Sequence, residues 1–557
     1  RTRSRKIRVS SIYLFLKRAY KSAVHKLMYM RFKLFLCSLC LALATFAQKG
    51  TIKVAVFSIN DFHGAFVQNV SQAIPGAPSI WQTLDSLKAV YPYNITVAAG
   101  DNFGGSYFYR ATQGQLLPVF FNDLGIRISA LGNHEFDDGQ ASLAEKWSAD
   151  PLLPRGWDIT YVCSNVYDSN GRIPPYVKPF ATTEIKLSPT KSLKAAFVGL
   201  LASSAPEQIR ANNVVGLHFS GNYPHVLDSL AQTPGFKAVQ EADLRMLLVH
   251  IGTIMKGGKP VWTDKDEENL ARIDDKLYQG ILSGHSHEPV CGRINKAQYP
   301  VVQGWWHGNY ISIMKFTVDT AAMRVLDVEP EICRVPLKSR DQLSAGPLRL
   351  QMQIDSLLQT TKTPAGVPIG TKLTTATRDM PHDRTDSYRL SEVGTLVCAS
   401  FAEAYRNAAG RKDKDVIVGC SHFGSIRAGF SKGDVSVLEV GEALPFANAL
   451  KAYAISGKQL KDLVNFGFHN KRYGWMQSAY LSIKRNDEGE VTAITYISPK
   501  GKKVKIKDNT KVVLIADEFM TTGGDGYPTK YFPKEQLINA KLPTTTDAFI
   551  AYLKQLP

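Results

Sequence analysis

The chain has 557 residues, 44% of them hydrophobic and 21% charged, which is an ordinary globular composition and enough for two to four domains. Eleven Lys or Arg and no acidic residue fall in the first 48 positions, so the net charge of +18 falls to +7 in the rest of the chain. This modest, dispersed excess argues against nucleic-acid binding by charge alone, and the five scattered cysteines beyond residue 48 exclude a disulfide scaffold.

Residues 30–48 have the layout of a secretory signal peptide. Two basic residues precede the apolar run 34–46, which ends in small residues and Gln48. A membrane-spanning helix needs roughly 18 to 20 apolar residues, so cleavage near Ala47 is expected rather than permanent anchoring. Residues 1–29 are interpreted as an over-extended N-terminus. The mature protein is expected in the periplasm, on the cell surface or secreted, without a transmembrane helix.

The region 51–336 alternates short apolar runs with polar loops and helical stretches. This alternation predicts a layered α/β domain. The polar loops hold nearly all histidines of this half, where sheet folds place their chemistry. The expected strands are Ile52–Ile59, Ile95–Ala99, Ala195–Leu201, Met246–Val249 and Gly280–Leu282.

Five clusters of polar residues follow apolar runs and predict a metal site. They lie, in chain order, at 60–64, 100–102, 132–135, 249–252 and 283–287. A single histidine at a strand end is more often structural, but five successive clusters favour ligands that converge. Mixed imidazole and carboxylate ligands suit Mn, Zn, Fe or Co rather than Ca. Asp101 stands alone in its cluster and suits a bridging role between two ions. The candidate ligands are Asp61, His63, Asp101, Asn133, His250, His285 and His287.

After residue 336 the sequence pattern changes from short apolar runs to a helix and a linker. Apolar residues at helical spacing predict a helix at Pro347–Gln359, and a Pro- and Gly-containing linker follows it. We assign 337–367 to this linker helix and hinge, and 368–557 to a second domain. That domain is expected to contain a helix at Val393–Ala408 and a strand at Val512–Ala516.

The five clusters, in this order, resemble the signature of the calcineurin-like metallophosphoesterases. The resemblance implies a mixed α/β fold in which a four-layer β-sandwich, flanked by helices, is joined by a linker to a second α/β domain. It also implies the ligand sets: Asp61, His63 and His287 for one ion, Asn133, His250 and His285 for the other, with Asp101 between them. His134 would face the substrate phosphate, oriented by Asp137.

Residues 368–557 resemble the C-terminal domain of 5'-nucleotidases. The landmarks are the segments 388–394, 424–427, 444–448 and 519–527, the last being the most specific. By this resemblance, a base stacks on Phe446 and Phe519, ribose hydroxyls bind Asp525, and Arg389 and Arg427 grip phosphate. Two positions depart from the family, because His422 replaces its usual Asn and Ser387 replaces an Arg.

The resemblances imply a 5'-nucleotidase that uses two metal ions and in-line attack by water, and the layout of residues 30–48 predicts that it is exported. They also imply a hinge near residues 360–370. Other readings stay open: a 2',3'-cyclic nucleotide 2'-phosphodiesterase with 3'-nucleotidase activity, a UDP-sugar hydrolase on the same fold, or a surface nucleoside-binding protein. The expected partner is a small nucleotide, not a nucleic-acid polymer. The preferred base, the metal and the oligomeric state stay open.

Overall fold

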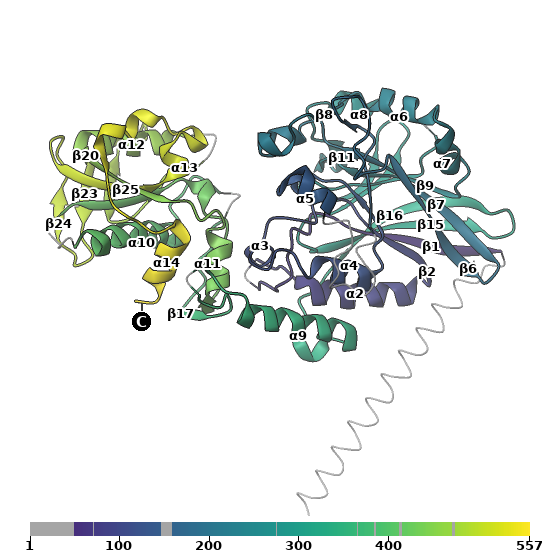
Figure 1. Cartoon of the computed structure of the whole chain (residues 1–557), viewed down its shortest axis with the longest axis horizontal. Coiled ribbons are helices and arrows are strands. Elements are labelled where there is room, and N and C mark those ends of the chain that lie inside the picture. Colours follow the sequence, from purple (N-terminus) through teal and green to yellow (C-terminus); the bar gives the residue numbers. More distant parts are fainter. Residues whose placement is uncertain are drawn as a thin grey trace, which may run out of the picture.

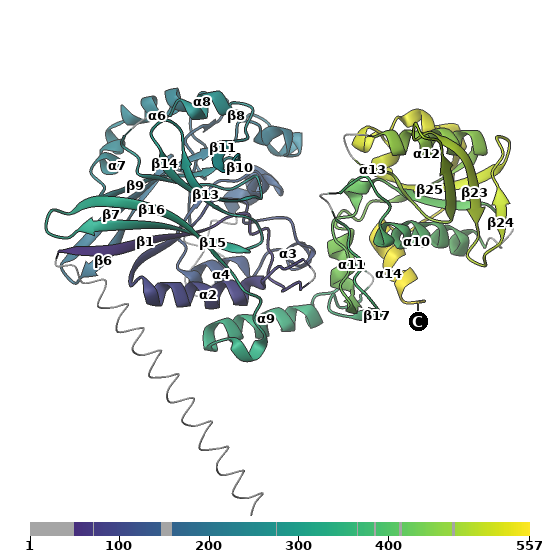
Figure 2. The ribbon, with the colours of Figure 1, turned by 180° about the vertical axis from the view of Figure 1, so that it is seen from behind.

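The computed structural model describes residues 50–70, 72–145, 159–273, 276–364, 366–383, 386–410, 415–470 and 474–556. The predicted leader at 30–48 and the basic segment before it lie outside these residues. Figures 1 and 2 show two lobes of mixed α/β structure, as expected from the sequence. The first lobe contains β1 to β16, the second contains β17 to α14, and helix α9 (Ala345–Thr360) joins them.

The first lobe is built on two six-stranded sheets, with orders β16-β15-β1-β2-β3-β4 and β13-β14-β12-β9-β7-β6. The central strands run parallel in both sheets. All five apolar runs predicted as strands are strands. The first sheet comprises β1 (Thr51–Ile59), β2 (Tyr93–Ala98), β3 (Ile128–Ala130), β4 (Thr160–Val162), β15 (Tyr310–Asp319) and β16 (Arg324–Arg334). The second sheet comprises β6 (Phe180–Ser188), β7 (Lys191–Leu201), β9 (Leu244–His250), β12 (Gly280–Leu282), β13 (Pro289–Ile294) and β14 (Tyr299–Gly304).

Strand β1 shows how the sequence builds the layers, because alternate side chains of a strand face opposite sides. Val54 and Val56 belong to the core between the sheets, together with Phe197 of the second sheet. Phe57 and Ile59 belong to the core that includes the covering helices. Helices α2 (Gly76–Val90) and α4 (Leu117–Leu124) lie on one side of this sandwich, and α6 (Tyr223–Ala231), α7 (Lys237–Gln240) and α8 (Glu267–Ala271) lie on the other (Figure 1). The expected four layers are present.

The second lobe has a five-stranded sheet with the order β21-β18-β25-β20-β26. Helices α10 and α14 pack on one face, and α12 packs on the other. The predicted helix at 393–408 and strand at 512–516 are α10 and β25. The elements are β18 (Ile417–Ser421), β20 (Leu450–Ser456), β21 (Gln477–Ser478), β25 (Lys511–Asp517), β26 (Leu537–Ile538), α10 (Glu392–Ala409), α12 (Gly457–His469), α13 (Glu518–Thr521) and α14 (Thr545–Leu553).

Smaller elements complete the lobes. The three-stranded sheet β22-β23-β24 packs beside α12, and three two-stranded sheets pair β5 with β8, β10 with β11, and β17 with β19. Their bounds are β22 (Leu481–Arg485), β23 (Val491–Ile497), β24 (Lys503–Lys505), β5 (Val166–Tyr167), β8 (His218–Phe219), β10 (Thr253–Lys256), β11 (Lys259–Trp262), β17 (Lys372–Ala376) and β19 (Gly433–Ser436), and helix α5 spans Gly139–Glu145.

The lobes touch where α11 (Val437–Ala443) packs on α3 (Tyr107–Ala111). Leu438 of α11 joins the apolar core of the first lobe. Gly441 allows the close approach, since a Cβ there would lie 2.2 Å from the Tyr107 ring. Glu442 Oε1 accepts a hydrogen bond from the Tyr107 backbone nitrogen at 2.8 Å. This contact ties the second lobe to the loop that leaves β2.

Two further properties of the described residues concern membrane helices and cysteines. Among the described residues, no helix is long and apolar enough to cross a membrane. The cysteines beyond the predicted leader are free thiols, namely Cys163, Cys291, Cys333, Cys398 and Cys420.

Candidate metal centre

The seven predicted ligands lie at the carboxyl ends of parallel strands from both sheets of the first lobe. Because the two sheets pack face to face, the loops at these ends meet at one edge of the sandwich. The ligands are Asp61 and His63 after β1, Asp101 after β2, Asn133 after β3, His250 at the end of β9, and His285 and His287 after β12.

Most of these ligands have left-handed backbone. The φ angles are 48° at Asp61, 49° at His63, 52° at Asp101, 87° at His285 and 55° at His287. Residues with a Cβ adopt this region at a cost of about 1–2 kcal/mol each. The neighbouring backbone holds it in place, since His63 N donates to the Asp101 carbonyl at 3.1 Å. Clustered strain of this kind is characteristic of functional sites.

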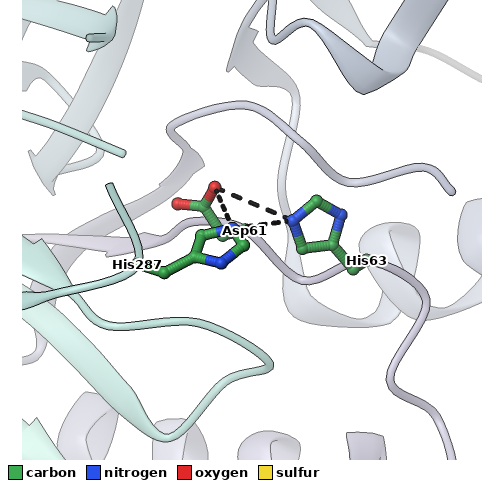
Figure 3. Close-up of side chains that lie close together, drawn as sticks. All are labelled: Asp61, His63 and His287. Carbon is green, nitrogen blue, oxygen red and sulfur yellow. Dashed lines mark hydrogen bonds and ion pairs between the residues drawn. The ribbon is translucent and has the colours of Figure 1, made fainter. Parts of the chain in front are cut away.

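Asp61, His63 and His287 form one compact group (Figure 3). His287 Nε2 lies 3.0 Å from His63 Nε2 and 3.2 Å from Asp61 Oδ1. Asp61 is completely buried, and Asn60 Nδ2 donates to its Oδ2 at 2.7 Å. Transition-metal ions bind nitrogen and oxygen ligands at about 2.0–2.2 Å, so three atoms at this spacing can surround one ion.

Asp101, His250 and His285 form an adjoining group. Asp101 Oδ2 lies 3.0 Å from His250 Nε2, and Asn133 Oδ1 lies 3.0 Å from His285 Nδ1. Asp101 Oδ2 also lies 3.9 Å from His63 Nε2 of the first group. This position between the two groups supports the predicted bridging role of Asp101.

The imidazoles offer the nitrogen that a metal ion would need. With Nδ1 as donor, His250 bonds to the Ala99 carbonyl at 2.8 Å and His63 bonds to the Phe103 carbonyl at 3.3 Å. In the neutral form of each ring, these bonds leave the lone pair of Nε2 directed at the centre. The buried His250 Nε2 makes no hydrogen bond of acceptable geometry in the described part of the chain, although Asp101 Oδ2 lies 3.0 Å away. An orphaned buried atom beside carboxylates fits a divalent metal ion.

Burial and nearby charges give the histidines of the centre different pKa values. Burial and the nearby His134 lower the pKa of His63 to about 3, which keeps this imidazole neutral and able to ligate. Burial and His250 lower the pKa of His285 to about 4. Burial alone would also lower the pKa of His250, but the Asp101 carboxylate raises it to about 10. A metal ion would therefore compete with a proton for His250 Nε2.

His134 and Asp137 lie beside the ligands. His134 Nδ1 donates to Asp137 Oδ2 at 2.8 Å. The His134 backbone nitrogen donates to Asp101 Oδ1 at 2.8 Å. The His134 ring stands edge-on to His63 with centroids 4.9 Å apart. This imidazole therefore borders both ligand groups.

Glu135 is a structural member of the centre that the sequence prediction does not include. It is buried and accepts backbone N–H groups of Asp101 at 3.0 Å, Asn102 at 2.8 Å and Gly132 at 2.8 Å. It thereby fixes the loop after β2 to the loop after β3. In the sequence, only the position of Glu135 directly after Asn133 and His134 indicates that it belongs to the centre.

The loop after β14 also borders the centre and was not predicted. Trp306 stacks on His287 with centroids 5.2 Å apart and planes at 23°. The His307 backbone nitrogen donates to the Asp61 carbonyl at 2.7 Å. The Trp-Trp-His run at 305–307 is the sequence signal for this rim.

Contacts in the second lobe link four of the five predicted substrate residues. Phe519 packs on His422, which is bonded to Asp525. Arg427 donates to the Gly424 carbonyl, beside Asp525, and its guanidinium lies 5.8 Å from the centroid of the Phe446 ring. Phe519 and Phe446 are 45% and 54% exposed, so both rings are open to a ligand.

The fifth predicted substrate residue, Arg389, lies in the loop before α10. Its guanidinium is 3.8 Å from the carboxylates of Asp383 and Asp386. These ion pairs are long and exposed, so they hold the arginine only weakly.

Two facing sheets with paired His and Asp groups at their strand ends define the class of metal-dependent phosphoesterases. Sequence comparison identifies residues 55–289 as a calcineurin-like phosphoesterase and residues 368–531 as a 5'-nucleotidase C-terminal domain. The chain therefore belongs to the 5'-nucleotidase family, a family of metal-dependent hydrolases.

Several known proteins resemble the chain along most of its length. A cell wall protein of Listeria monocytogenes is 22% identical over 91% of this chain and 68% of its own length. An endonuclease of Bacillus subtilis is 23% identical over 90% of this chain, which spans only 40% of that longer protein. A 5'-nucleotidase precursor from Thermus thermophilus has the same fold, with a TM-score of 0.61, 20% identity and coverage of 91% and 97% of the two chains.

Proposed function

We propose that the chain is an exported phosphohydrolase that releases phosphate from nucleotides with two divalent transition-metal ions, Mn, Zn, Fe or Co. The position of Asp101 between two ligand groups carries the proposal, because a shared carboxylate is typical of dimetal phosphoester hydrolysis. Export is supported by the layout of residues 30–48 and by the relative described as a cell wall protein.

Each group of ligands would hold one ion. When bound, the ions would supply an activated water and neutralise charge on the phosphate. The proposed assignment is Asp61, His63 and His287 for one ion, Asn133, His250 and His285 for the other, and Asp101 for both.

His134 is the proposed catalytic residue next to the ligands. Water attacks phosphorus in line with the leaving oxygen, so the new P–O bond forms while the bond to the nucleoside breaks, and no covalent phosphoenzyme forms. Asp137 holds the His134 ring through Nδ1, which leaves Nε2 to donate to a phosphate oxygen and stabilise its developing charge.

The second lobe supplies the substrate contacts. Phe446 and Phe519 would stack the base, Asp525 would accept ribose hydroxyls, and Arg389 and Arg427 would bind phosphate. The exposure of both aromatic rings and the weak pairing of Arg389 support these roles. Rotation near residues 360–370 would bring this lobe to the metal centre.

A substrate panel tests the proposal. Phosphate release is measured for AMP, UMP, UDP-glucose, 2',3'-cyclic AMP and bis(p-nitrophenyl) phosphate, with chelator and with added Mn, Zn or Co. We expect metal-dependent release from the monophosphates. A preference for the cyclic or diester compounds would assign a phosphodiesterase, a preference for UDP-glucose a sugar-nucleotide hydrolase, and binding without turnover a nucleoside-binding protein.

Two substitutions separate catalysis from folding. His134→Ala and Asp101→Asn are each expected to lower kcat by at least 100-fold while the thermal transition persists. His218→Ala is the matched control, because this histidine on β8 is exposed and belongs to none of the ligand groups. Unchanged turnover in both site variants would refute the mechanism.

A further inference from the structure

His422 is a residue of the second lobe to which the proposed substrate site gives no role. It follows β18, and its ring is buried, with 4% exposed. Its centroid lies 5.1 Å from that of Phe519, which is 45% exposed. The imidazole therefore forms the inner wall behind an aromatic ring that is open to solvent.

A short hydrogen bond joins His422 to Asp525. The two residues are 103 positions apart, and Nδ1 lies 2.5 Å from Oδ2. Nδ1 carries the proton, because an ionised carboxylate can only accept. Among the described residues, no group donates to the other oxygen, Oδ1, and 18% of the Asp525 side chain is exposed. His422 therefore holds Oδ2 of Asp525, and Oδ1 is available to accept a hydrogen bond from a ligand.

The backbone around this pair leaves room for the carboxylate. Asp525 has left-handed backbone, with φ of 48°. A Cβ at Gly424 would lie 2.7 Å from Asp525 Oδ2, so a side chain there would displace the carboxylate. Asn470 Nδ2 donates to the Asp525 carbonyl at 3.1 Å. Three segments of the lobe therefore converge to place this carboxylate.

Packing alone does not account for a histidine at position 422. Its Nε2 is buried and has no hydrogen-bond partner among the described residues. An unpaired buried nitrogen is destabilising, and an apolar side chain of similar size would avoid that penalty. The bond to Asp525 is the contribution that an apolar residue could not make.

We propose that His422 is a positioning residue that fixes Asp525, keeps one carboxylate oxygen free for a sugar hydroxyl, and thereby selects ribonucleotides over deoxyribonucleotides. The inference rests on the proposed function, in which a nucleoside stacks on Phe519. A site built to accept a hydroxyl discriminates against a sugar that lacks it, because its polar group is then left unpaired.

The test compares three substitutions at this position. Asn places an amide N–H where Nδ1 lies, whereas Gln places it near Nε2 and Ala removes it. The kcat and KM values are measured for AMP, 2'-deoxy-AMP and 3'-deoxy-AMP, with p-nitrophenyl phosphate reporting on the metal centre. We expect His422→Ala and His422→Gln to reduce the preference for AMP about tenfold, through KM, and His422→Asn to preserve it.

Two outcomes would overturn the inference. One is an unchanged preference for AMP in the Ala and Gln variants, and the other is an equal loss of activity toward all four compounds, which would indicate a purely structural role. If the wild-type protein does not hydrolyse AMP, the proposed function fails instead. Calorimetric binding of adenosine against 2'-deoxyadenosine and 3'-deoxyadenosine to the same variants then decides the role of His422 separately.

Discussion

At the scale of single residues, the metal centre depends on positions that have no room for a side chain. Gly105 has φ of +72°, and a Cβ there would lie 2.4 Å from the Cβ of His63. We expect Gly105→Ala to displace His63 and to weaken metal binding about 10–100-fold, as for other losses of support around a ligand. Metal content at graded free-metal concentrations, read by mass spectrometry, measures the change.

Gly171→Ala is the control for this prediction. Gly171 has the same φ of +72°, but nothing lies within 4 Å of an added Cβ. Gly171→Ala therefore carries the backbone cost of about 1–2 kcal/mol without the collision. Equal loss of metal in both variants would show that backbone strain, rather than contact with His63, governs the site.

The site was predictable from the sequence to the extent that its residues follow strands in recognisable clusters. Asp61, His63 and His250 were predicted this way, because His and Asp side chains at strand ends are typical metal ligands. Glu135 was not found, because its role depends on which backbone N–H groups lie around it. The bond between His422 and Asp525 spans 103 residues, and no local pattern signals it.

At the scale of elements, helix α9 is anchored to the first lobe along one face. Leu350 is 1% exposed and packs into the core of that lobe, whereas Met352 is 56% exposed. We expect Leu350→Ala to lower the free energy of unfolding by about 2–5 kcal/mol, because it leaves a cavity. Met352→Ala should change it by less than about 0.5 kcal/mol. Urea unfolding followed by circular dichroism gives both values, and similar losses would contradict the assigned face.

Helices of the structure differ in how well the sequence predicts them. The helical spacing of apolar residues predicted α9 at 347–359, close to the observed Ala345–Thr360. Helices α3 and α11 span only Tyr107–Ala111 and Val437–Ala443, which is too short for a periodic pattern. Their packing against each other joins distant parts of the chain and emerges only from the tertiary structure.

At the scale of the whole molecule, Glu442 is an ionisable group in the contact between the lobes. Its Oε1 accepts the backbone N–H groups of Tyr107 at 2.8 Å and Phe108 at 3.4 Å. Burial raises the pKa of Glu442 from 4.5 to about 7, although Arg110 and these N–H groups act in the opposite direction. Glu439 of the same helix adds to the increase. The contact therefore favours the protonated side chain.

The direction of the pH dependence follows from this increase. A carboxyl group whose pKa is higher in the contact stabilises the contact fully below about pH 4.5, and the contribution is lost as pH rises through about 7. We expect the lobes of the wild-type protein to separate more readily at pH 8 than at pH 5. Glu442→Gln keeps an oxygen acceptor and cannot ionise, so its lobe separation should not change over this range.

Fluorescence energy transfer between labels on the two lobes, recorded from pH 5 to pH 8, measures this separation. Glu490→Gln is the control, because it removes the same charge at a position outside the contact between the lobes. Glu490 is exposed and directly precedes β23. The control should follow the wild-type protein. If Glu442→Gln and wild type respond alike, Glu442 does not set the pH dependence of the contact.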